Sequence, residues 1–327
     1  MHAVMHPQYA TSSNACSGTA RRLVFRRASG TSHRGFPHRK SEKRRAVRFM
    51  PHATAAASDG LPTLYDVPVS NNGARVRLIL YWKDMEHLVS VKNPSELGGL
   101  KSETYLALNP QGKMPLLVMT PDEDALPHGL ALPESEVIAQ FLLEKYSQIG
   151  PELIPGDLHQ HALAMLATRV HDLYIAPVQG CMYRGPMGVA KRAEDIATIA
   201  KQMDAVEKIF ADAKRLRLNA HTENDHHDDD TTDGPFICGP EPCFADAALF
   251  PTWIFMERIL PTYFGWDGVF EKRPLTEKWF LAMAADTCGA RVLGEIRGGL
   301  DDWHGAGRWE TTGVNDAVMN TEYKWKY

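Results

Sequence analysis

The spacing of apolar residues predicts a small α/β domain over residues 61–148. Its strands alternate apolar with polar positions, and its helices carry apolar residues three and four apart. The predicted elements are a strand at 61–69, a helix at 74–84, strands at 88–91, 115–119 and 129–132, and a helix at 134–146. Because a strand–helix–strand unit crosses over in one hand, the first two strands are expected to run parallel.

A linker containing Pro and Gly at 149–157 separates this domain from a segment with a helical pattern. Apolar residues step by three and four along two stretches: Leu163, Leu166, Val170 and Leu173, and then Ile196, Ile199, Met203, Val206 and Phe210. This period is typical of amphipathic helices. The second stretch is too short to indicate a zipper. Residues 155–310 are therefore predicted to form an all-helical domain.

The segment 219–234 interrupts the helical pattern with acidic residues and three histidines. Carboxylates and imidazoles are metal ligands, but here they have no fixed spacing. Polar, acidic segments of this kind are typically disordered. We therefore expect an acidic insertion in a surface loop at 219–234 and no metal site.

Composition narrows the class of protein further. No apolar run reaches the roughly 18–20 residues of a membrane span, so no membrane span is expected. The 327 residues include five cysteines and no C-x-x-C pair, which argues against a disulfide framework. Cys181, Cys238, Cys243 and Cys288 are expected to be reduced, structural thiols.

The net charge of −4 is unevenly distributed, because residues 1–58 contain eleven Lys and Arg and a single acid. The acidic remainder lacks the clustered cations that nucleic-acid binding needs, so no nucleic-acid partner is expected. The first 58 residues are rich in Arg, Ser, Thr and Ala and lack the apolar core of a secretory signal. They are predicted to be a disordered transit peptide for the chloroplast, with the mitochondrion as the alternative. A basic arm that binds RNA or acidic lipid is the competing interpretation.

The first candidate site residue is Ser70, which ends the first predicted strand and precedes Asn71-Asn72-Gly73. A hydroxyl at the N-terminus of the next helix can donate a hydrogen bond to a thiolate, and the helix end favours the anion. The same hydroxyl can also serve simply as the helix cap.

Two further segments suit a peptide or an amino acid. Lys113-Met114-Pro115 precedes a strand, where a cis bond would leave the backbone of Met114 free to pair with an extended peptide. Glu134-Ser135 opens the second helix, whose free N–H groups and Ser135 hydroxyl can bind a carboxylate while Glu134 holds an ammonium. An edge proline and an ordinary acidic helix start are the simpler interpretations.

Together these segments resemble the glutathione transferase family. The resemblance rests on Ser70-x4-Arg75-Val76-Arg77, on Asn109-Pro110-Gln111-Gly112-Lys113-Met114-Pro115, on Leu132-Pro133-Glu134-Ser135 with the helix that follows, and on Ala245-Asp246. It covers about 61–300 and implies a thioredoxin-like domain followed by an all-helical domain. It also implies glutathione as co-substrate without a metal, and a homodimer.

The resemblance gives each candidate a role. Met114 would pair its backbone with the cysteinyl part of glutathione across a cis Pro115. The pair Glu134-Ser135 would hold the γ-glutamyl end, and Lys113 would reach toward the glycyl carboxylate. Ser70 would activate the thiol, as the corresponding residue does in serine-type members.

The implied reaction is conjugation of glutathione to a small electrophile, with peroxide reduction as a further activity. The electrophile pocket is expected between the domains, near His171 and Tyr174. Serine in place of cysteine at position 70 disfavours thiol–disulfide exchange. One alternative is the zeta-type isomerase, which shares Arg75-Val76-Arg77 but has Ser-Ser-Cys where this chain has Ser70-Asn71-Asn72. The other is a non-catalytic module that carries ligands or serves as a subunit.

The same comparison predicts a weakened helix start at Asp246. The family usually has Ser or Thr three residues before this Asp, whereas this chain has Cys243. A thiol is a poor cap, so a loss of about 0.5–2 kcal/mol of stability is expected there.

Overall fold

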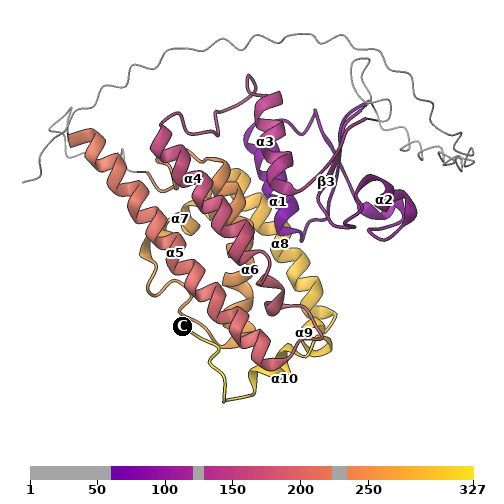
Figure 1. Ribbon diagram of the computed structural model, residues 1–327, viewed down its shortest axis with the longest axis vertical. Helices are drawn as coiled ribbons and strands as arrows, with labels where there is room; N and C mark the ends of the chain where they lie inside the picture. The colour runs from indigo at the N-terminus through magenta and orange to yellow at the C-terminus, as the bar shows by residue number, and fades with distance from the viewer. Residues whose placement is uncertain (1–59, 121–128, 223–233) are drawn as a thin grey trace, which may run out of the picture. The chain divides into compact units, whose positions relative to one another are not determined.

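The computed structural model describes residues 60–120, 129–222 and 234–327. The predicted leader at 1–58 lies outside these ranges. So does most of the predicted insertion, although residues 219–222 continue a helix. The described part of the chain contains a small sheet with its helices and a larger array of helices (Figure 1).

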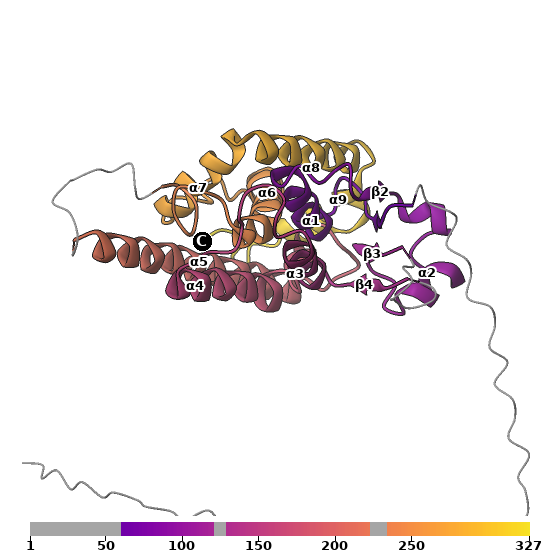
Figure 2. The ribbon, with the colours of Figure 1, turned by 90° about the horizontal axis from the view of Figure 1, so that it is seen from above.

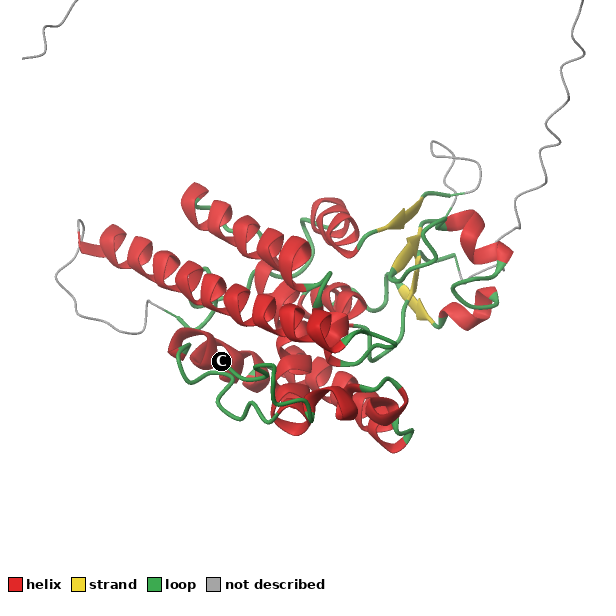
Figure 3. Cartoon of the chain, turned by 60° about the horizontal axis from the view of Figure 1, so that its bottom comes forward, coloured by secondary structure: helices red, strands yellow, loops and turns green. Residues whose placement is uncertain are grey.

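The N-terminal domain is built on a four-stranded sheet. Its elements are β1 (Thr63–Tyr65), α1 (Asn71–Trp82), β2 (Ser90–Lys92), the 3-10 helix η1 (Pro94–Leu97), α2 (Glu103–Leu108), β3 (Leu116–Val118), β4 (Ala131–Pro133) and α3 (Ser135–Lys145). The strand order is β2-β1-β3-β4. The predicted parallel pairing of β1 with β2 is confirmed, and the other neighbours are antiparallel. Figure 3 shows the strands together, away from most of the helices.

The C-terminal domain is helical. Its elements are α4 (Leu158–Val170), the π-helical turn η2 (His171–Ile175), the 3-10 helix η3 (Gln179–Met182), α5 (Val189–Thr222), α6 (Phe244–Phe264), α7 (Pro274–Ala285), α8 (Thr287–Gly305), α9 (Arg308–Thr311) and α10 (Val314–Val318). The predicted sequence of a thioredoxin-like domain and an all-helical domain is confirmed. Within the described ranges, none of these helices is both long and apolar enough to cross a membrane.

Helix α6 lies at the centre of the core because it is apolar around most of its circumference. Its residues Phe250, Trp253 and Ile254 are fully buried. Figure 2 shows α6 and α1 between a layer with α7 and α8 and a layer with α3, α4 and α5. One hydrophobic cluster therefore contains residues of both domains, and it places the N-terminus of α1 beside the helical domain.

The two predicted apolar stretches differ in burial. Both stretches are helical as predicted, the second in α5 and the first in α4 and η2. The α5 stretch is buried at Ile196, Ile199, Met203, Val206 and Phe210. In the first stretch Val170 is buried, but Leu166 and Leu173 are 47% and 50% exposed, so its apolar row does not face the core throughout. One reason is the π-helical turn, in which the Ala176 N–H donates to the His171 carbonyl and shifts the helix face by one residue.

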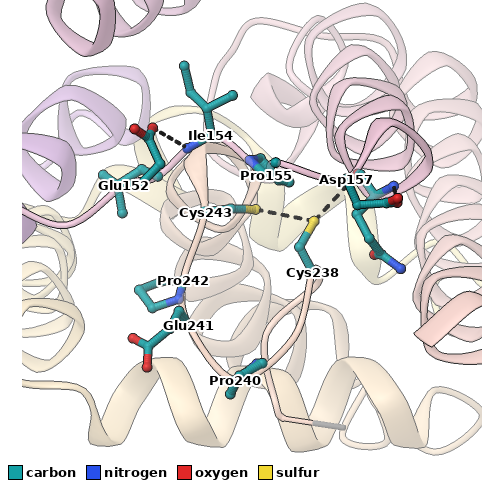
Figure 4. A pocket seen from close by; sticks show the side chains of 12 residues that line it. Glu152, Ile154, Pro155, Asp157, Cys238, Pro240, Glu241, Pro242 and Cys243 are labelled. Carbon is teal, nitrogen blue, oxygen red and sulfur yellow. Dashed lines mark hydrogen bonds between the residues drawn. The ribbon is translucent and has the colours of Figure 1, made fainter. Parts of the chain in front are cut away.

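The start of α6 combines a buried carboxylate with two thiols, Cys238 and Cys243, whose sulfurs face each other in Figure 4. Asp246 accepts hydrogen bonds from Cys243 N (2.7 Å), Ile237 N (3.1 Å) and Trp279 Nε1 (2.8 Å). Burial raises the pKa of Asp246, although these donors oppose that shift. The sulfurs of Cys243 and Cys238 lie 3.7 Å apart beside a cavity of about 300 Å³. All four cysteines of the described ranges are free thiols, as predicted.

Several short elements were not predicted from the sequence. Helix α2 lies in the polar stretch before Asn109, where Ser102 Oγ accepts from Tyr105 N (3.1 Å) and caps the helix. At the other end of the chain, Trp309 stacks on Tyr263 with ring centroids 4.0 Å apart, and its Nε1 donates to the Met182 carbonyl. The aromatic C-terminal segment is therefore part of the helical domain's packing.

Candidate functional site

Two cavities lie where the N-terminal domain meets the helical domain. The α3 cavity has a volume of about 460 Å³ and is bordered by the start of α3 and by η2. The α8 cavity has a volume of about 510 Å³ and extends from the start of α1 to α8. Both are lined by Asn72, Lys113, Met114, Ala176 and Pro177, so they are adjoining parts of one site.

All six residues that the sequence singled out line these cavities. Lys113 and Met114 line both, Pro115, Glu134 and Ser135 line the α3 cavity, and Ser70 lines the α8 cavity. They come from the β1–α1 turn, from the segment before β3 and from the start of α3. The sheet brings these three segments together.

The backbone at Met114 is free to pair with an extended ligand. The Met114-Pro115 bond is cis, as predicted. The hydroxyl of Tyr105 and the side-chain amide of Asn109 both donate to the Lys113 carbonyl at 2.7 Å, which fixes the preceding loop. Among the described residues, none forms a hydrogen bond with the N–H or C=O of Met114.

The start of α3 is a ready anion site. Ile138 N is the first amide to bond within the helix, to the Glu134 carbonyl, so the preceding N–H groups lack helical acceptors. Ser135 is the first helical residue, and its hydroxyl lies at the cavity wall. Glu134 has a φ of 71°, a backbone conformation that is rare for residues other than glycine. Such conformations cost about 1–3 kcal/mol and gather at binding sites.

The α3 cavity carries charges of both signs. Its lining includes the carboxylates of Glu134, Glu136 and Asp172 and the cations of Lys113 and Arg169. A ligand with one ammonium and one carboxylate, such as the head of an α-amino acid, finds partners for both charges here.

Ser70 is both a helix cap and a wall of the α8 cavity. Its Oγ accepts a hydrogen bond from Gly73 N at 3.1 Å, which caps α1. Accepting this bond uses a lone pair and leaves the hydroxyl hydrogen free to donate. The two interpretations of Ser70 made from the sequence are thus compatible.

The two asparagines after Ser70 have different surroundings. Asn71 is buried, and its Nδ2 donates to Gln179 Oε1 (3.0 Å) and Thr252 Oγ1 (2.8 Å) of the helical domain. Asn72 is only half-buried and lines both cavities. Asn71 also lines the α8 cavity, but its Nδ2 is engaged in these two bonds, so Asn72 is the better placed of the two to donate to a ligand.

Behind the site, a buried ion cluster connects the domains. Arg75 is 1% exposed and bonds to Asp172 (2.5 Å), Glu136 (3.4 Å) and His171 Nδ1 (2.9 Å). Burial alone would raise the pKa of Asp172, but the His171 hydrogen bond and the Arg75 charge hold it well below its usual range. Burial also raises the pKa of Glu136, against the opposing effect of Arg75.

His171 is neutral within this cluster. Burial lowers its pKa, and the Arg75 charge lowers it further, against the opposing effect of Asp172. Its Nδ1 lies 2.9 Å from Arg75 Nη2, a donor, and 2.8 Å from Asp172 Oδ1, an acceptor, so the tautomer decides which of these two bonds forms. Its Nε2 lies 2.7 Å from Thr252 Oγ1, and the hydroxyl takes the complementary role. With both ring nitrogens engaged in the buried cluster, His171 is a structural residue and lines neither cavity, contrary to the sequence expectation.

The wall of the α8 cavity comes from residues that the sequence did not indicate. Its far side consists of Tyr183, Arg184, Phe255, Trp303 and Arg308. Neither His171 nor Tyr174 lines it, so that part of the expectation is wrong. The wall residues come from the segment after η3, from α6, from α8 and from the start of α9, and no sequence spacing connects them.

Comparison with known proteins identifies the sheet domain. Residues 64–151 match the family model described as the N-terminal domain of glutathione S-transferase. The glutathione S-transferase-like protein OpS6 of Beauveria bassiana is 27% identical over 58% of this chain and 82% of its own length. Glutathione S-transferase 3 of Zea mays is 26% identical over 71% of this chain and 93% of its own length. A maleylacetoacetate isomerase of Pseudomonas aeruginosa is 33% identical over 35% of this chain and 53% of its own length.

Solved structures share the fold of both domains. Glutathione transferase F2 of Populus trichocarpa superposes with a TM-score of 0.54 at 18% identity, over 72% of this chain and 99% of that one. Ure2p in complex with glutathione superposes with a TM-score of 0.53 at 18% identity, over 72% of this chain and 93% of that one. Residues 64–151 thus resemble the N-terminal domain of glutathione S-transferases, the chain is similar in sequence to members of that family, and it shares their two-domain fold.

Proposed function

We propose that the protein conjugates glutathione to small electrophiles. The observation that carries the proposal is the convergence, in two adjoining cavities, of the free backbone of Met114, the start of α3 at Ser135 and the hydroxyl of Ser70. Each of these groups suits one part of the tripeptide. No single one of them would distinguish a glutathione site from an ordinary structural feature.

Glutathione would lie across both cavities. The carboxylate of its γ-glutamyl end binds the free N–H groups of α3 and the hydroxyl of Ser135. The ammonium faces Glu134, and the cysteinyl backbone pairs with Met114 as an added strand does. The glycyl carboxylate lies toward Lys113, and the thiol points to Ser70 in the α8 cavity.

Ser70 would lower the pKa of the thiol. A free thiol has a pKa of about 8.5, so only a small fraction is ionised at neutral pH. A hydrogen bond to a charged acceptor is worth about 1.5–3 kcal/mol, and each pKa unit corresponds to about 1.4 kcal/mol. The bond from Ser70 can therefore make the thiolate the main form, with Asn72 as a second donor within the site.

The thiolate sulfur then attacks the electrophilic carbon. A carbon–sulfur bond forms, the leaving group departs with its electron pair, and the thiol proton passes to water. With an organic hydroperoxide, the sulfur instead attacks the peroxide oxygen and releases an alcohol. A second glutathione then converts the resulting sulfenic acid to glutathione disulfide and water.

The test uses the full chain with 1-chloro-2,4-dinitrobenzene and with cumene hydroperoxide. Ser70→Ala is expected to lower kcat about tenfold to a hundredfold while leaving the Kd for glutathione nearly unchanged. Ser102→Ala is the matched control, because it also removes a helix cap but lies outside both cavities. An unchanged kcat in Ser70→Ala with a large loss in Asn72→Ala would transfer the role to Asn72. Unchanged values in both variants would refute this mechanism.

The isomerase alternative draws on the Pseudomonas aeruginosa relative and on Arg75-Val76-Arg77. Both arginines are committed elsewhere, since Arg75 is buried against Asp172 and Arg77 bonds to Asp66 and to Glu295 (2.9 Å). They therefore do not favour isomerisation over conjugation. Conversion of maleylacetone with catalytic glutathione, without conjugation of any electrophile, would support the isomerase. Binding of glutathione without any turnover would support the non-catalytic module.

A further inference from the structure

The far wall of the α8 cavity is aromatic. The rings of Tyr183 and Phe255 have centroids 5.6 Å apart, those of Tyr183 and Trp303 are 5.2 Å apart, and those of Phe255 and Trp303 are 6.1 Å apart. Tyr183 and Phe255 are buried beneath the surface of the cavity. A planar ring bound here would meet ring faces and edges, which is the arrangement that favours aromatic ligands.

The same cavity is lined by cations and by no acid. Arg184, Arg308 and Lys113 line it, whereas none of its lining residues is Asp or Glu. Among the described residues no carboxylate forms a salt bridge with these three cations. By contrast, exposed arginines elsewhere, such as Arg215 and Arg258, are each paired with an aspartate. The cavity therefore holds uncompensated positive charge.

The two guanidinium groups are positioned by the aromatic wall. Arg308 Cζ lies 3.8 Å from the centroid of the Trp303 ring, and Arg184 Cζ lies 5.6 Å from that of Tyr183. A guanidinium stacked on a ring, as that of Arg308 is on Trp303, keeps its N–H groups directed outward, where a carboxylate can accept two of them. Burial raises the pKa of Tyr183 and keeps its hydroxyl protonated, against the opposing charges of Arg184 and Arg308. That hydroxyl accepts from Gln179 Nε2 at 3.0 Å, which leaves its hydrogen free to donate.

We propose that the electrophile taken by this cavity is an aromatic compound bearing a carboxylate, with its ring against Tyr183, Phe255 and Trp303 and its carboxylate on Arg184 and Arg308. This inference rests on the proposed function, because it names the substrate class of the same site. The carboxylate takes no part in the reaction. With an aryl chloride the thiolate sulfur bonds to the ring carbon, the carbon–chlorine bond breaks, and chloride leaves with the electron pair.

The kinetic test compares 4-chloro-3,5-dinitrobenzoate with the neutral 4-chloro-3,5-dinitrobenzamide. Each value of kcat/KM is divided by the uncatalysed rate constant with glutathione, which removes the difference in intrinsic reactivity. The full-length protein is expected to prefer the carboxylate about tenfold, mainly through KM. The preference should shrink as salt is raised, because Arg184 is exposed and its charge is screened.

Variants at Arg184 assign the preference to the cavity. Arg184→Gln should remove most of the preference for the carboxylate by raising the KM for the benzoate, and Arg184→Lys should retain part of the preference. Arg215→Gln removes the same charge from an exposed site on α5 and should change neither substrate. A rise in the KM for glutathione in place of that for the benzoate would overturn the proposal, because Arg184 would then bind the tripeptide's own carboxylate.

Calorimetry with two conjugates separates this inference from the proposed function. S-(4-carboxybenzyl)glutathione should bind about tenfold more tightly than S-benzylglutathione. Arg308→Gln should reduce this difference in Kd between the two conjugates. Thermal unfolding of Arg308→Gln shows whether the loss of its contact with Trp303 has disturbed the fold. If both conjugates bind equally well, the inference fails and the proposed function stands. If neither conjugate binds, the proposed function fails as well.

Discussion

His171 is a buried histidine whose protonated form the fold disfavours. Burial and the neighbouring charge of Arg75 lower its pKa, against the effect of Asp172. An unfolded histidine titrates near pH 6.5, so below that pH the unfolded chain binds a proton that the folded chain does not. We expect the free energy of unfolding to fall by up to about 1.4 kcal/mol per pH unit below pH 6.5, until the lowered pKa of the folded state is reached.

Urea unfolding between pH 5 and 7 measures this effect. His171→Gln should be less stable at pH 7, but its free energy of unfolding should not fall with pH in this way. His159→Gln replaces a side chain that is 74% exposed and should keep the pH dependence of the wild-type protein. Asp172 cannot produce the slope, because a lowered carboxyl pKa costs stability only below its unfolded value of about 3.9. Equal slopes in the wild-type protein and in His171→Gln would contradict the assignment.

Gly73 is required by the packing of α1 against Asp66. A Cβ built on Gly73 would lie 1.8 Å from Asp66 Oδ1, and Asp66 is itself buried and paired with Arg77. Gly73→Ala is therefore expected to cost about 2–4 kcal/mol in the free energy of unfolding. Gly294→Ala in α8 is the control, since a Cβ there meets nothing within 4 Å. It should be neutral or stabilising by up to about 1 kcal/mol, because alanine is the better helix former.

Among single residues, the sequence predicts the part of the site proposed for glutathione far better than the part proposed for the electrophile. Ser70, Met114 and Glu134 occur in segments with a fixed order, and all line the cavities. The difference between Asn71 and Asn72 depends on partners in α6 and η3, more than 100 positions away. Nothing in the local sequence around Arg184 indicates the rings and charges that it meets.

The cap at the start of α6 departs from the pattern of the glutathione transferases that the chain resembles. Cys243 occupies the cap position, and its N–H donates to Asp246 (2.7 Å). A hydroxyl accepts from the first-turn amides better than a thiol does, so Cys243→Ser should raise the free energy of unfolding by about 0.5–1 kcal/mol. Cys238→Ser removes the neighbouring sulfur without changing the cap and should lack this gain. Thermal and urea unfolding distinguish the two, and a loss in Cys243→Ser would mean that packing of the buried thiol matters more.

Elements with a long or strictly periodic pattern were predictable, and short ones were not. The α5 stretch from Ile196 to Phe210 is buried as its period indicates, since a long outer helix has one face toward the core. Helix α2 has six residues, too few for a period to show, and is held by a Ser102 cap and by Tyr105, which is fully buried. Leu173, which is half exposed, lies in a π-helical turn that apolar spacing does not reveal.

For the whole molecule, the basic segment 1–58 is proposed to direct the protein to the chloroplast. The proposal rests on its eleven Lys and Arg, its single acid and its Ser, Thr and Ala content. The full chain fused to a fluorescent protein should accumulate in the chloroplast, and a chain starting at Asp59 should not. Accumulation in mitochondria would select the alternative destination. An unchanged distribution after removal of 1–58 would reject a targeting role.

A second copy of the chain is the partner proposed for the apolar face of α3 and α4. This face consists of five apolar side chains that are 47–76% exposed: Val137 of α3 and, at helical spacing, Leu158, Met165, Leu166 and Leu173. Exposed apolar patches of this kind mark interaction surfaces. Val137 and Leu173 also line the α3 cavity, so a partner on this face would border the proposed glutathione site.

Replacing a central residue of this face with a charge should separate the two copies. Burying an unpaired carboxylate in an apolar interface costs several kcal/mol, so Leu166→Glu is expected to convert a dimer to a monomer of 36.5 kDa. Leu281→Glu is the matched control, because Leu281 is 62% exposed on α7 and should leave the dimer intact. Sedimentation velocity at micromolar concentration measures both. A wild-type protein that sediments as a monomer, or a Leu166→Glu variant that stays dimeric, would rule out this interface.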